Sequence, residues 1–284
     1  MIESLKIIKN RIRSTENTKK VTAAMEMVSV AKLSRIEKNL LALRPYVTAL
    51  SSLMHNLINA CDCPTHSFLV AKVPSERICL CVITSDSGLC GAYNNNIIRA
   101  AEQFINSHGK ENVDLVCVGR KGFNYFKRNN FNIINTYIGM NGRFSDKVSI
   151  AITNNLVDLF VSGKSAYVYA AYTHFKTALV NEPMVEKILN IEGASETKTE
   201  YILEPDMDAI LNEIIPKYLF MKLRLIILEA FTAEHSARTL AMKTATDNAK
   251  DLLQGLVLLR NKVRQANITQ EIMEIISSSE ALKG

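Results

Sequence analysis

Glycine and proline are almost absent from the two ends of this chain, and this absence limits what the ends can fold into. Residues 1–44 contain neither, and residues 217–283 contain only Gly255, whereas residues 45–216 hold nine of the eleven glycines. Because glycine and proline commonly end helices, each terminal segment can form one long helix. The two helices would span roughly 66 and 100 Å, against about 40 Å for a compact domain of this length. We therefore expect both ends to extend from a central domain.

A repeat of apolar residues with alternating spacings of three and four runs through residues 33–57. A seven-residue repeat of this kind predicts a helix that packs lengthwise against another helix. Pro45 lies within it, where we expect a kink or a local adjustment. Traced towards the N-terminus, the repeat becomes polar and then apolar again. Its members are Leu5, Ile8, Ile12, Thr15, Lys19, Thr22, Glu26, Ser29, Leu33, Ile36, Leu40, Leu43, Val47, Leu50, Met54 and Leu57.

The C-terminal segment also has apolar seam positions on both sides of a polar middle. We assign to its seam Ile214, Met221, Leu225, Leu228, Thr232, His235, Thr239, Thr246, Leu252, Leu256, Leu259 and Val263. Both segments join one central domain, so they are expected to pair antiparallel, in a pair that is loosely packed in its middle or faces another protein. The C-terminal helix should extend beyond its partner near residues 268–282. There apolar residues cover about half of its circumference, so this tip needs a covering partner.

The formal net charge of +6 lies entirely in the N-terminal segment. Residues 1–57 carry ten Lys/Arg and four Asp/Glu, while residues 58–205 and 206–284 are each balanced. A solvated face explains such a run equally well. The functional interpretation is a helix that faces nucleic acid, a membrane surface or an acidic protein cavity.

Other features exclude several classes of protein. No run of 18 apolar residues predicts a transmembrane helix, and the N-terminus lacks the apolar core of a signal peptide, so we interpret it as mature sequence. Six cysteines occur in the chain, and Cys79 and Cys81 alternate within an expected strand, which favours buried thiols of a reducing compartment. Cys61 and Cys63, near His55 and His66, do not have the spacing of a usual zinc site. We expect neither a metal nor a cofactor.

The middle of the chain predicts an α/β domain. Strand-like segments at 78–84, 113–119, 131–139 and 166–175 alternate with helix-like segments at 94–107, 120–128 and 145–161. Such alternation predicts a mostly parallel, Rossmann-like sheet. The expected organisation is an N-terminal coiled-coil helix over 1–60, a central α/β domain over 61–205 and a C-terminal coiled-coil helix over 206–284.

Three motifs suggest chemistry, but each lacks a part that the chemistry needs. Residues 163–165, Gly-Lys-Ser, end like a phosphate-binding loop but lack its first glycine and lead from helix into strand. Residues 86–88, Asp-Ser-Gly, occur once, whereas an aspartic protease needs two carboxylates that share a proton. Residues 119–122 could hold an anion at a helix N-terminus, but a plain turn is the favoured interpretation. His235 is expected to be packed or hydrogen-bonded. We assign no catalytic residue.

Four segments resemble one known family. NTKKVTAAMEMVSVAK (17–32), SDSGLCGAYNNNI (85–97), EHSARTLAMKTATDNA (234–249) and RQANITQEIMEIIS (264–277) are similar, in this order, to the gamma subunits of F-type ATP synthases. The resemblance extends from end to end. It implies a rotor shaft inside a hexamer of alpha and beta subunits, whose foot meets the epsilon subunit and the membrane c ring. The catalytic sites would belong to beta, and proton-driven rotation would drive them through ATP synthesis.

The resemblance also implies contact residues. Met25 and Glu26 would face the beta subunits, and Arg264 with Gln265 would engage a loop of the alpha–beta ring. Thr269 and Glu271 would belong to the C-terminal signature of the family. Tyr201, Glu204 and Pro205 would lie near the foot that meets the c ring or epsilon. The basic N-terminal helix would suit acidic loops of beta. The implied location is peripheral, on the cytoplasmic side of a bacterial plasma membrane, with the mitochondrial matrix side as the alternative.

Two departures from the family pattern stand out: Ser278-Ser279 replaces Gly-Ala, and Ser87 replaces Arg. Two other functions remain open from the residues themselves. A basic coiled-coil protein could bind nucleic acid through residues 6–38, with an affinity that falls steeply with salt. An α/β enzyme with a coiled-coil dimerisation arm would gather polar groups at the carboxyl ends of its strands, where Asp86 and Arg120 are the candidates.

Overall fold

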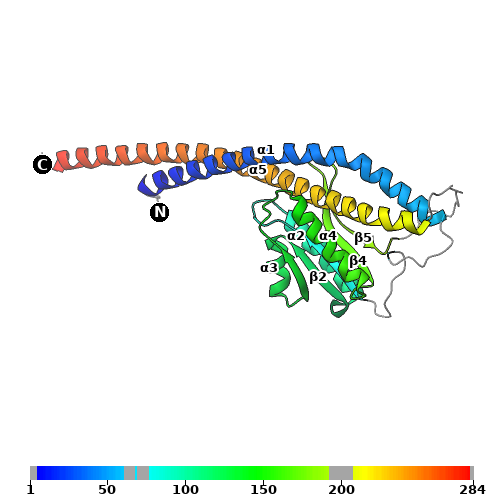
Figure 1. Ribbon diagram of the computed structural model, residues 1–284. Helices are drawn as coiled ribbons and strands as arrows, with labels where there is room; N and C mark the ends of the chain where they lie inside the picture. The colour runs from blue at the N-terminus through cyan, green and yellow to red at the C-terminus, as the bar shows by residue number, and fades with distance from the viewer. Residues whose placement is uncertain (1–4, 61–67, 69–76, 192–206, 282–284) are drawn as a thin grey trace. The chain divides into compact units, whose positions relative to one another are not determined.

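Two long helices open and close the part of the chain that the computed structural model describes, which is residues 5–60, 68, 77–191 and 207–281 (Figure 1). Helix α1 comprises Leu5–Ala60 and helix α5 comprises Met207–Ala281. Each contains one proline, Pro45 and Pro216. Neither proline ends its helix, because both are exposed and water can bond to the carbonyl that the missing N–H leaves unpaired.

A five-stranded sheet of order β3-β2-β1-β4-β5 forms the centre of the fold. The strands are β1 (Ile78–Ile83), β2 (Val113–Val118), β3 (Ile133–Tyr137), β4 (Tyr167–Phe175) and β5 (Asn181–Leu189). Strands β1 to β4 pair in parallel, which confirms the predicted Rossmann-like α/β fold. Strand β5 pairs antiparallel with β4 and was not predicted. It contains Pro183 and three charged residues, a composition tolerated in an edge strand.

The connecting helices divide between the two faces of the sheet. Helices α2 (Tyr93–His108) and α3 (Arg120–Arg128) follow β1 and β2, and α4 (Asp146–Val161) follows β3. Alternate residues of β1 pack with α2 and α3 on one face and with α1, α4 and α5 on the other. Every residue of β1 and β2 is buried, as expected for parallel strands covered on both sides. The thiols of Cys79, Cys81, Cys90 and Cys117 are free and buried.

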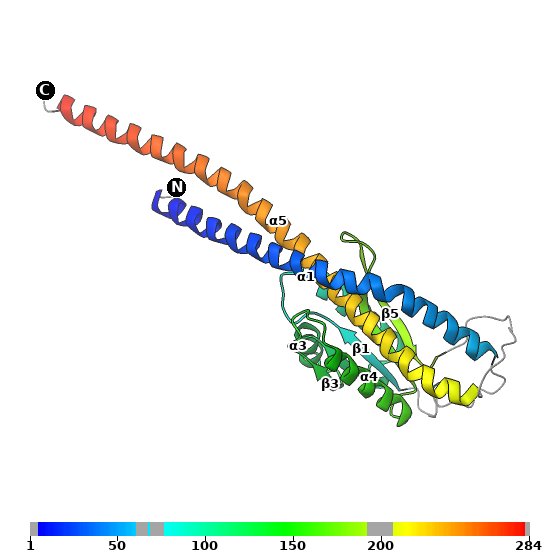
Figure 2. The same ribbon diagram turned by 45° about the horizontal axis from the view of Figure 1, so that its top comes forward.

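The chain forms two compact units, to which both long helices contribute. Residues 1–28 and 239–284 form one, called here the paired-helix unit, and residues 29–238 form the α/β unit. Within each unit α1 and α5 lie side by side (Figures 1 and 2). In the α/β unit the predicted seam of α1 is correct, because all its positions from Ser29 to Leu57 are buried or half-buried. On α5, residues 226–236 are buried on all sides.

The paired-helix unit has a thinner and more polar seam. All α1 positions predicted from Leu5 to Glu26 are at least half-buried. On α5 the seam was predicted wrongly at Leu252 and Leu259, which are 55% and 39% exposed. A regular three-and-four count back from Val263 passes through Arg260 and Leu253 instead, whereas the prediction followed the nearest leucines. The at least half-buried seam residues on α5 are Thr239, Met242, Thr246, Ala249, Leu253, Leu256, Arg260 and Val263.

Candidate functional site

The paired-helix unit carries large apolar side chains on its outside. Met27 of α1 is 73% exposed and Ile275 of α5 is 69% exposed. Residues 268–279 of α5 are all exposed. Isolated exposed apolar side chains are ordinary, but an extended apolar surface indicates a partner. The exposed apolar set comprises Ile7, Val21, Met25, Met27 and Val28 on α1, and Leu240, Leu252, Leu258, Leu259, Ile268, Ile272, Met273, Ile275 and Ile276 on α5.

The two contact residues expected on α1 differ in their surroundings. Met25 is 39% exposed and belongs to the apolar outer surface. Glu26 is half-buried on the seam. Asp247 raises the pKa of Lys250, and the charge of Glu26 adds a smaller contribution, so Glu26 lies near Lys250 of α5.

The contact residues expected on α5 all lie on its exposed surface. Arg264, Gln265, Thr269 and Glu271 are exposed, and the Thr269 hydroxyl donates to the Gln265 carbonyl at 3.0 Å. Helical spacing puts Arg264, Ile268 and Glu271 on one face, so charged and apolar groups alternate there. Tyr201, Glu204 and Pro205 lie outside the described residues, as do Cys61 and Cys63.

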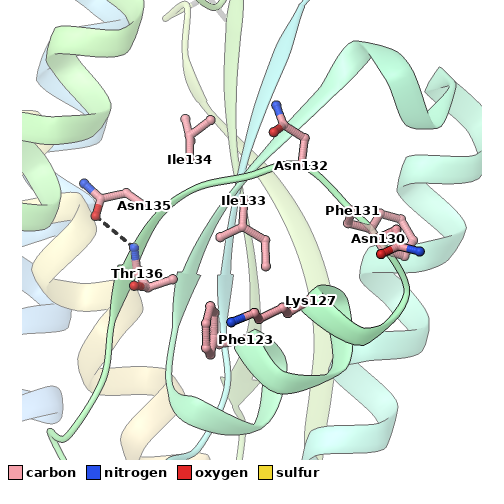
Figure 3. Close-up of a pocket in the computed structure, with 9 residues that line it drawn as sticks. All are labelled: Phe123, Lys127, Asn130, Phe131, Asn132, Ile133, Ile134, Asn135 and Thr136. Atoms are coloured by element: carbon pink, nitrogen blue, oxygen red, sulfur yellow. Dashed lines mark hydrogen bonds between the residues drawn. The ribbon is translucent and has the colours of Figure 1, made fainter.

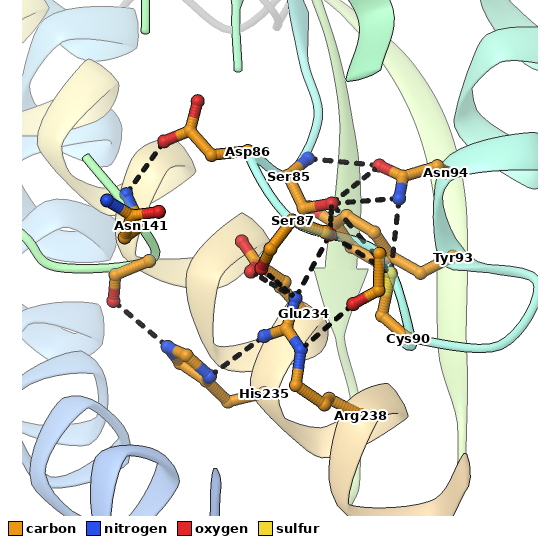
Figure 4. Close-up of polar contacts among 12 residues, drawn as sticks. Ser85, Asp86, Ser87, Cys90, Tyr93, Asn94, Asn141, Glu234, His235 and Arg238 are labelled. Atoms are coloured by element: carbon orange, nitrogen blue, oxygen red, sulfur yellow. Dashed lines mark hydrogen bonds and ion pairs between the residues drawn. The ribbon is translucent and has the colours of Figure 1, made fainter. Parts of the chain in front are cut away.

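A second candidate site is a buried polar cluster in the α/β unit, where the chain leaves β1 (Figure 4). The Asn94 amide donates to Ser85 Oγ at 2.8 Å, and its carbonyl accepts from the Ser85 N–H at 3.0 Å. The backbone turns left-handed at Leu89 and Gly91, with φ of 61° and 57°. These contacts fix a tight turn, and the carbonyls of Ser87 and Gly88 in it accept from a side chain of α5.

Arg238 of α5 fills the space against this turn. Its Nε donates to the Gly88 carbonyl at 3.3 Å, and its Nη2 lies 3.3 and 3.1 Å from the carbonyl and hydroxyl oxygens of Ser87. Nη2 also pairs with Glu234 Oε1 at 2.7 Å, and Nη1 lies 3.2 Å from His235 Nδ1. We call Ser87, Gly88, Gly142, Glu234, His235 and Arg238 the Arg238 cluster. A rigid guanidinium with several donors suits such a set of acceptors.

His235 joins the cluster to the loop after β3. Its Nε2 donates to the Gly142 carbonyl at 3.0 Å, so its Nδ1 accepts from Arg238. Burial lowers the pKa of His235 to about 4, because the charged form is desolvated and Arg238 and Lys32 repel it. The prediction of a hydrogen-bonded histidine is confirmed. Gly142 has a φ of 64°, and a Cβ there would lie 2.4 Å from His235 Nε2, so only glycine fits.

Glu234 and Lys32 complete the electrostatics of this site. Glu234 is 1% exposed, its Oε2 has no hydrogen-bond partner in the structure, and burial raises its pKa despite the neighbouring Arg238. Lys32 of α1 donates to the Asn141 carbonyl at 3.3 Å, and burial together with Arg143 and Arg238 lowers its pKa. Both long helices are therefore hydrogen-bonded or ion-paired at the carboxyl edge of the sheet.

Residues 119–122 form a plain turn, which is the interpretation favoured from the sequence over an anion site. The first four backbone N–H groups of α3 already have acceptors within the protein. In chain order from Arg120 these are Asp86 Oδ1, Ser85 O, Thr84 Oγ1 and Gly119 O, at 2.9–3.3 Å. Asp86 also accepts from the N–H groups of Gly139 and Asn141 at 3.0 and 2.7 Å. Its carboxylate is thus engaged in holding two loops and the N-terminus of α3.

The cavities offer little for catalysis. One of about 690 Å³ follows the open edge strand β3 (Figure 3), and among its lining residues only Lys127 is charged. Asn135 Oδ1 in this cavity accepts from the Thr136 N–H at 2.8 Å. Another, of about 630 Å³, lies at the amino ends of the strands, where Arg77 pairs with Asp114 at 3.3 Å. An α/β enzyme would use the opposite edge, so neither cavity supports that alternative.

Membrane spans and metal clusters are both absent from the described part of the chain. No helix within 5–60, 77–191 and 207–281 is long and apolar enough to cross a membrane. In the same ranges no three His, Cys, Asp or Glu side chains gather in a way that could hold a metal ion.

Comparison with known proteins decides between the remaining interpretations. The family model described as ATP synthase matches residues 4–282. The ATP synthase gamma chain of Pelotomaculum thermopropionicum is 36% identical, and that of Geobacter sp. strain M21 is 38% identical, each over 99% of both chains. This chain belongs to the ATP synthase gamma chain family. Members of this family are the central stalk of F-type ATP synthases.

A solved structure shares the fold of this gamma-family chain. A chain in the Euglena gracilis mitochondrial ATP synthase, solved as OSCP/F1/c-ring in rotational state 3, has a TM-score of 0.73 with 17% identity. The match covers 98% of this chain and 94% of that one.

The structure brings three of the family-like segments together. Lys32 ends the segment 17–32, Ser85 to Asn94 belong to 85–97, and Glu234 to Arg238 begin 234–249. Sequence reasoning assigned no role to Arg238, Glu234 or Gly142. Two signals were available in the sequence. Glu234 and Arg238 are ionisable residues four positions apart in a largely apolar part of the expected helix, and Gly142 precedes Arg143 in a loop.

Proposed function

We propose that this chain is the central rotor shaft of an F-type ATP synthase. It couples proton-driven rotation of the membrane c ring to conformational changes at the catalytic sites of the beta subunits. Its partners are the alpha and beta subunits of the hexamer, the epsilon subunit and the c ring. It works as a non-catalytic subunit, peripheral to the membrane on the cytoplasmic side of a bacterial plasma membrane.

One observation carries this proposal: the paired-helix unit has polar residues within its seam and large apolar residues exposed on its surface. The seam includes Thr22 and Thr246, whereas Met27 and Ile275 are 73% and 69% exposed. A soluble helical pair normally has the reverse arrangement. Enclosure in an apolar collar of a hexamer would cover the outer surface and leave few specific bonds to resist turning.

The distribution of charge along the chain also supports the hexamer as the partner. Residues 1–57 carry the whole net charge of +6. Lys6, Lys9 and Arg13 are exposed, so acidic loops of the beta subunits could reach them. Met25, Arg264 and Gln265 would contact the hexamer from the exposed surface, together with Thr269 and Glu271, and Glu26 from the seam. Tyr201 and Glu204 would belong to the foot.

The shaft would act by differential contact. A ligand or partner shifts an equilibrium only by as much as it binds two states differently. As the shaft turns, its basic and apolar faces would meet each beta subunit in succession. Each angle would favour a different conformation of the three catalytic sites.

The test removes residues 268–284 from the chain within the complete enzyme. We expect loss of proton-coupled ATP synthesis in membrane vesicles and weaker assembly with the hexamer. Leu179→Ser is the matched control, because Leu179 is 76% exposed but lies in the α/β unit. Unchanged assembly and unchanged synthesis after the deletion would remove the physical basis of the proposal.

A further inference from the structure

The Arg238 cluster lies where α5 leaves the α/β unit. Arg238 is the last residue of that unit, and Ser29, three positions before Lys32, is its first. Both helices thus make buried or half-buried polar contacts to the carboxyl-edge loops within about one turn of these limits. These contacts are therefore placed to carry part of any torque that passes between the α/β fold and the long helices.

Apolar packing alone leaves the rotational setting of a helix weakly specified. Hydrophobic burial is proportional to area and has no direction, whereas hydrogen bonds require defined distances and angles. Phe231 of α5 packs in the apolar core, and the Ser236 hydroxyl donates a single hydrogen bond to the Ala178 carbonyl at 2.6 Å. Arg238 adds three contacts from its guanidinium to Ser87 and Gly88, at 3.1–3.3 Å.

The cluster is an expensive way to stabilise a fold. Burying Glu234 and Arg238, which are 1% and 8% exposed, removes two charges from water. Glu234 Oε2 has no hydrogen-bond partner in the structure, so the charge is incompletely compensated. A well-packed apolar pair in such places is often as stable or more stable. The arrangement therefore contributes a defined geometry of α5 rather than added stability.

We propose that Arg238 is a positioning residue for rotary coupling. Its bonds to Ser87 and Gly88 fix the rotational setting of α5 on the sheet, and Lys32 does the same for α1 through Asn141. His235 keeps the guanidinium in its plane by accepting at Nδ1 while it donates to Gly142. This inference rests on the proposed function as a rotor shaft.

The experiment uses the complete enzyme in vesicles with Arg238→Met and Arg238→Lys. Arg128→Met is the matched control, because Arg128 is an exposed arginine of the same unit. The readout is the number of protons pumped per ATP hydrolysed, measured at equal amounts of assembled complex. We expect a loss of about tenfold for Arg238→Met and a smaller loss for Arg238→Lys, which keeps the charge but not the fork of donors. The control should pump like the wild type.

A structural role alone would lower the amount of complex and leave the coupling ratio unchanged. A wild-type ratio in assembled Arg238→Met therefore overturns the inference. Where Arg238→Met does not assemble, Arg238→Lys decides in the same way. Failure of the wild-type chain to assemble with the hexamer would instead refute the proposed function.

Discussion

The same two helices pair twice in this molecule, and the two pairings differ in how polar their seams are and in how completely the helices are buried. In the α/β unit the seam of α1 is mostly apolar, with Leu40 and Met54 fully buried, and residues 226–236 of α5 are buried on all sides. In the paired-helix unit the seam mixes apolar residues such as Ile8 and Leu256 with the buried Thr22 and Thr246, and other large apolar residues face outward. The difference indicates that the first pairing is complete within this chain. Under the proposed function, the second would be completed by a partner.

The largest expected effect is the loss of stability when a seam leucine is truncated to alanine, and it should differ between the two units. Leu40→Ala should lower the free energy of opening of the α/β unit by about 3–4 kcal/mol, because its cavity lies in a closed core. Leu256→Ala should cost the paired-helix unit roughly half as much, since the surrounding thin seam can relax. Amide hydrogen exchange of the full chain measures each unit separately. Equal losses would show that the two seams are packed alike.

A second test concerns the loop against which His235 packs. Gly142→Ala introduces a Cβ that would lie 2.4 Å from His235 Nε2, and the residue has a φ of 64°. We expect a loss of about 3 kcal/mol in the α/β unit. Gly139→Ala is the control, since its φ is also positive but no atom lies within 4 Å of the added Cβ. It should cost only about 1 kcal/mol. Similar losses would mean that contact with His235 is unimportant.

A third test uses pH, because all five histidines lie within residues 29–238. The pKa of His235 is lowered to about 4 in the folded protein from an ordinary value of 6.5, so the unfolded chain binds the proton more tightly. The α/β unit should lose up to about 3 kcal/mol as pH falls from 6.5 to 4. The raised pKa of Glu234 acts in the opposite direction.

The control for this test is His235→Gln, whose amide can donate to Gly142 and accept from Arg238 without titrating. Urea midpoints of the α/β unit, measured for both proteins across this range, report the difference. The same pH dependence in His235→Gln would exclude His235 as its source. Histidine titration should leave the paired-helix unit unchanged, which sharpens the contrast between the units.

The smallest expected effect is a gain. Gly255 lies in the middle of α5 in the paired-helix unit, and a Cβ added there would meet no atom within 4 Å. Gly255→Ala should stabilise this unit by about 1 kcal/mol through helix propensity. Amide exchange of residues 245–265 should slow, while exchange in the α/β unit stays the same. A loss of stability would indicate that the helix requires flexibility at this position.

Most of the fold could be predicted because its signals are local and periodic. The alternation of strands and helices identified β1 to β4 and α2 to α4 within one or two residues. The seam of α1 could be predicted from one repeat, because the regular spacing of three and four fixes each seam position from the one before it. Strand β5 was missed because Pro183 and its charges resemble a loop, and only pairing with β4 makes it a strand.

The candidate site was harder to predict, because it depends on residues distant in sequence. Arg238 meets Ser87 across 151 positions, and His235 meets Gly142 across 93. No local pattern reports such pairs. The exposed tip of α5 was predictable, since its apolar residues cover too much of the helix for one seam. On the same helix, the seam was assigned to Leu252 and Leu259 because these leucines lie directly beside the true seam positions, Leu253 and Arg260.

The hydroxyls of Thr22 and Thr246 give the paired-helix unit a particular mechanical property. They are 2.8 Å apart, and each also lies within hydrogen-bond distance of a carbonyl of its own helix, that of Lys19 and that of Met242. Each hydroxyl can bond either to the other hydroxyl across the seam or to the carbonyl within its own helix. When the helices slide past each other, neither buried hydroxyl is therefore left without a hydrogen-bond partner. Small relative displacements should therefore meet low friction and relax elastically.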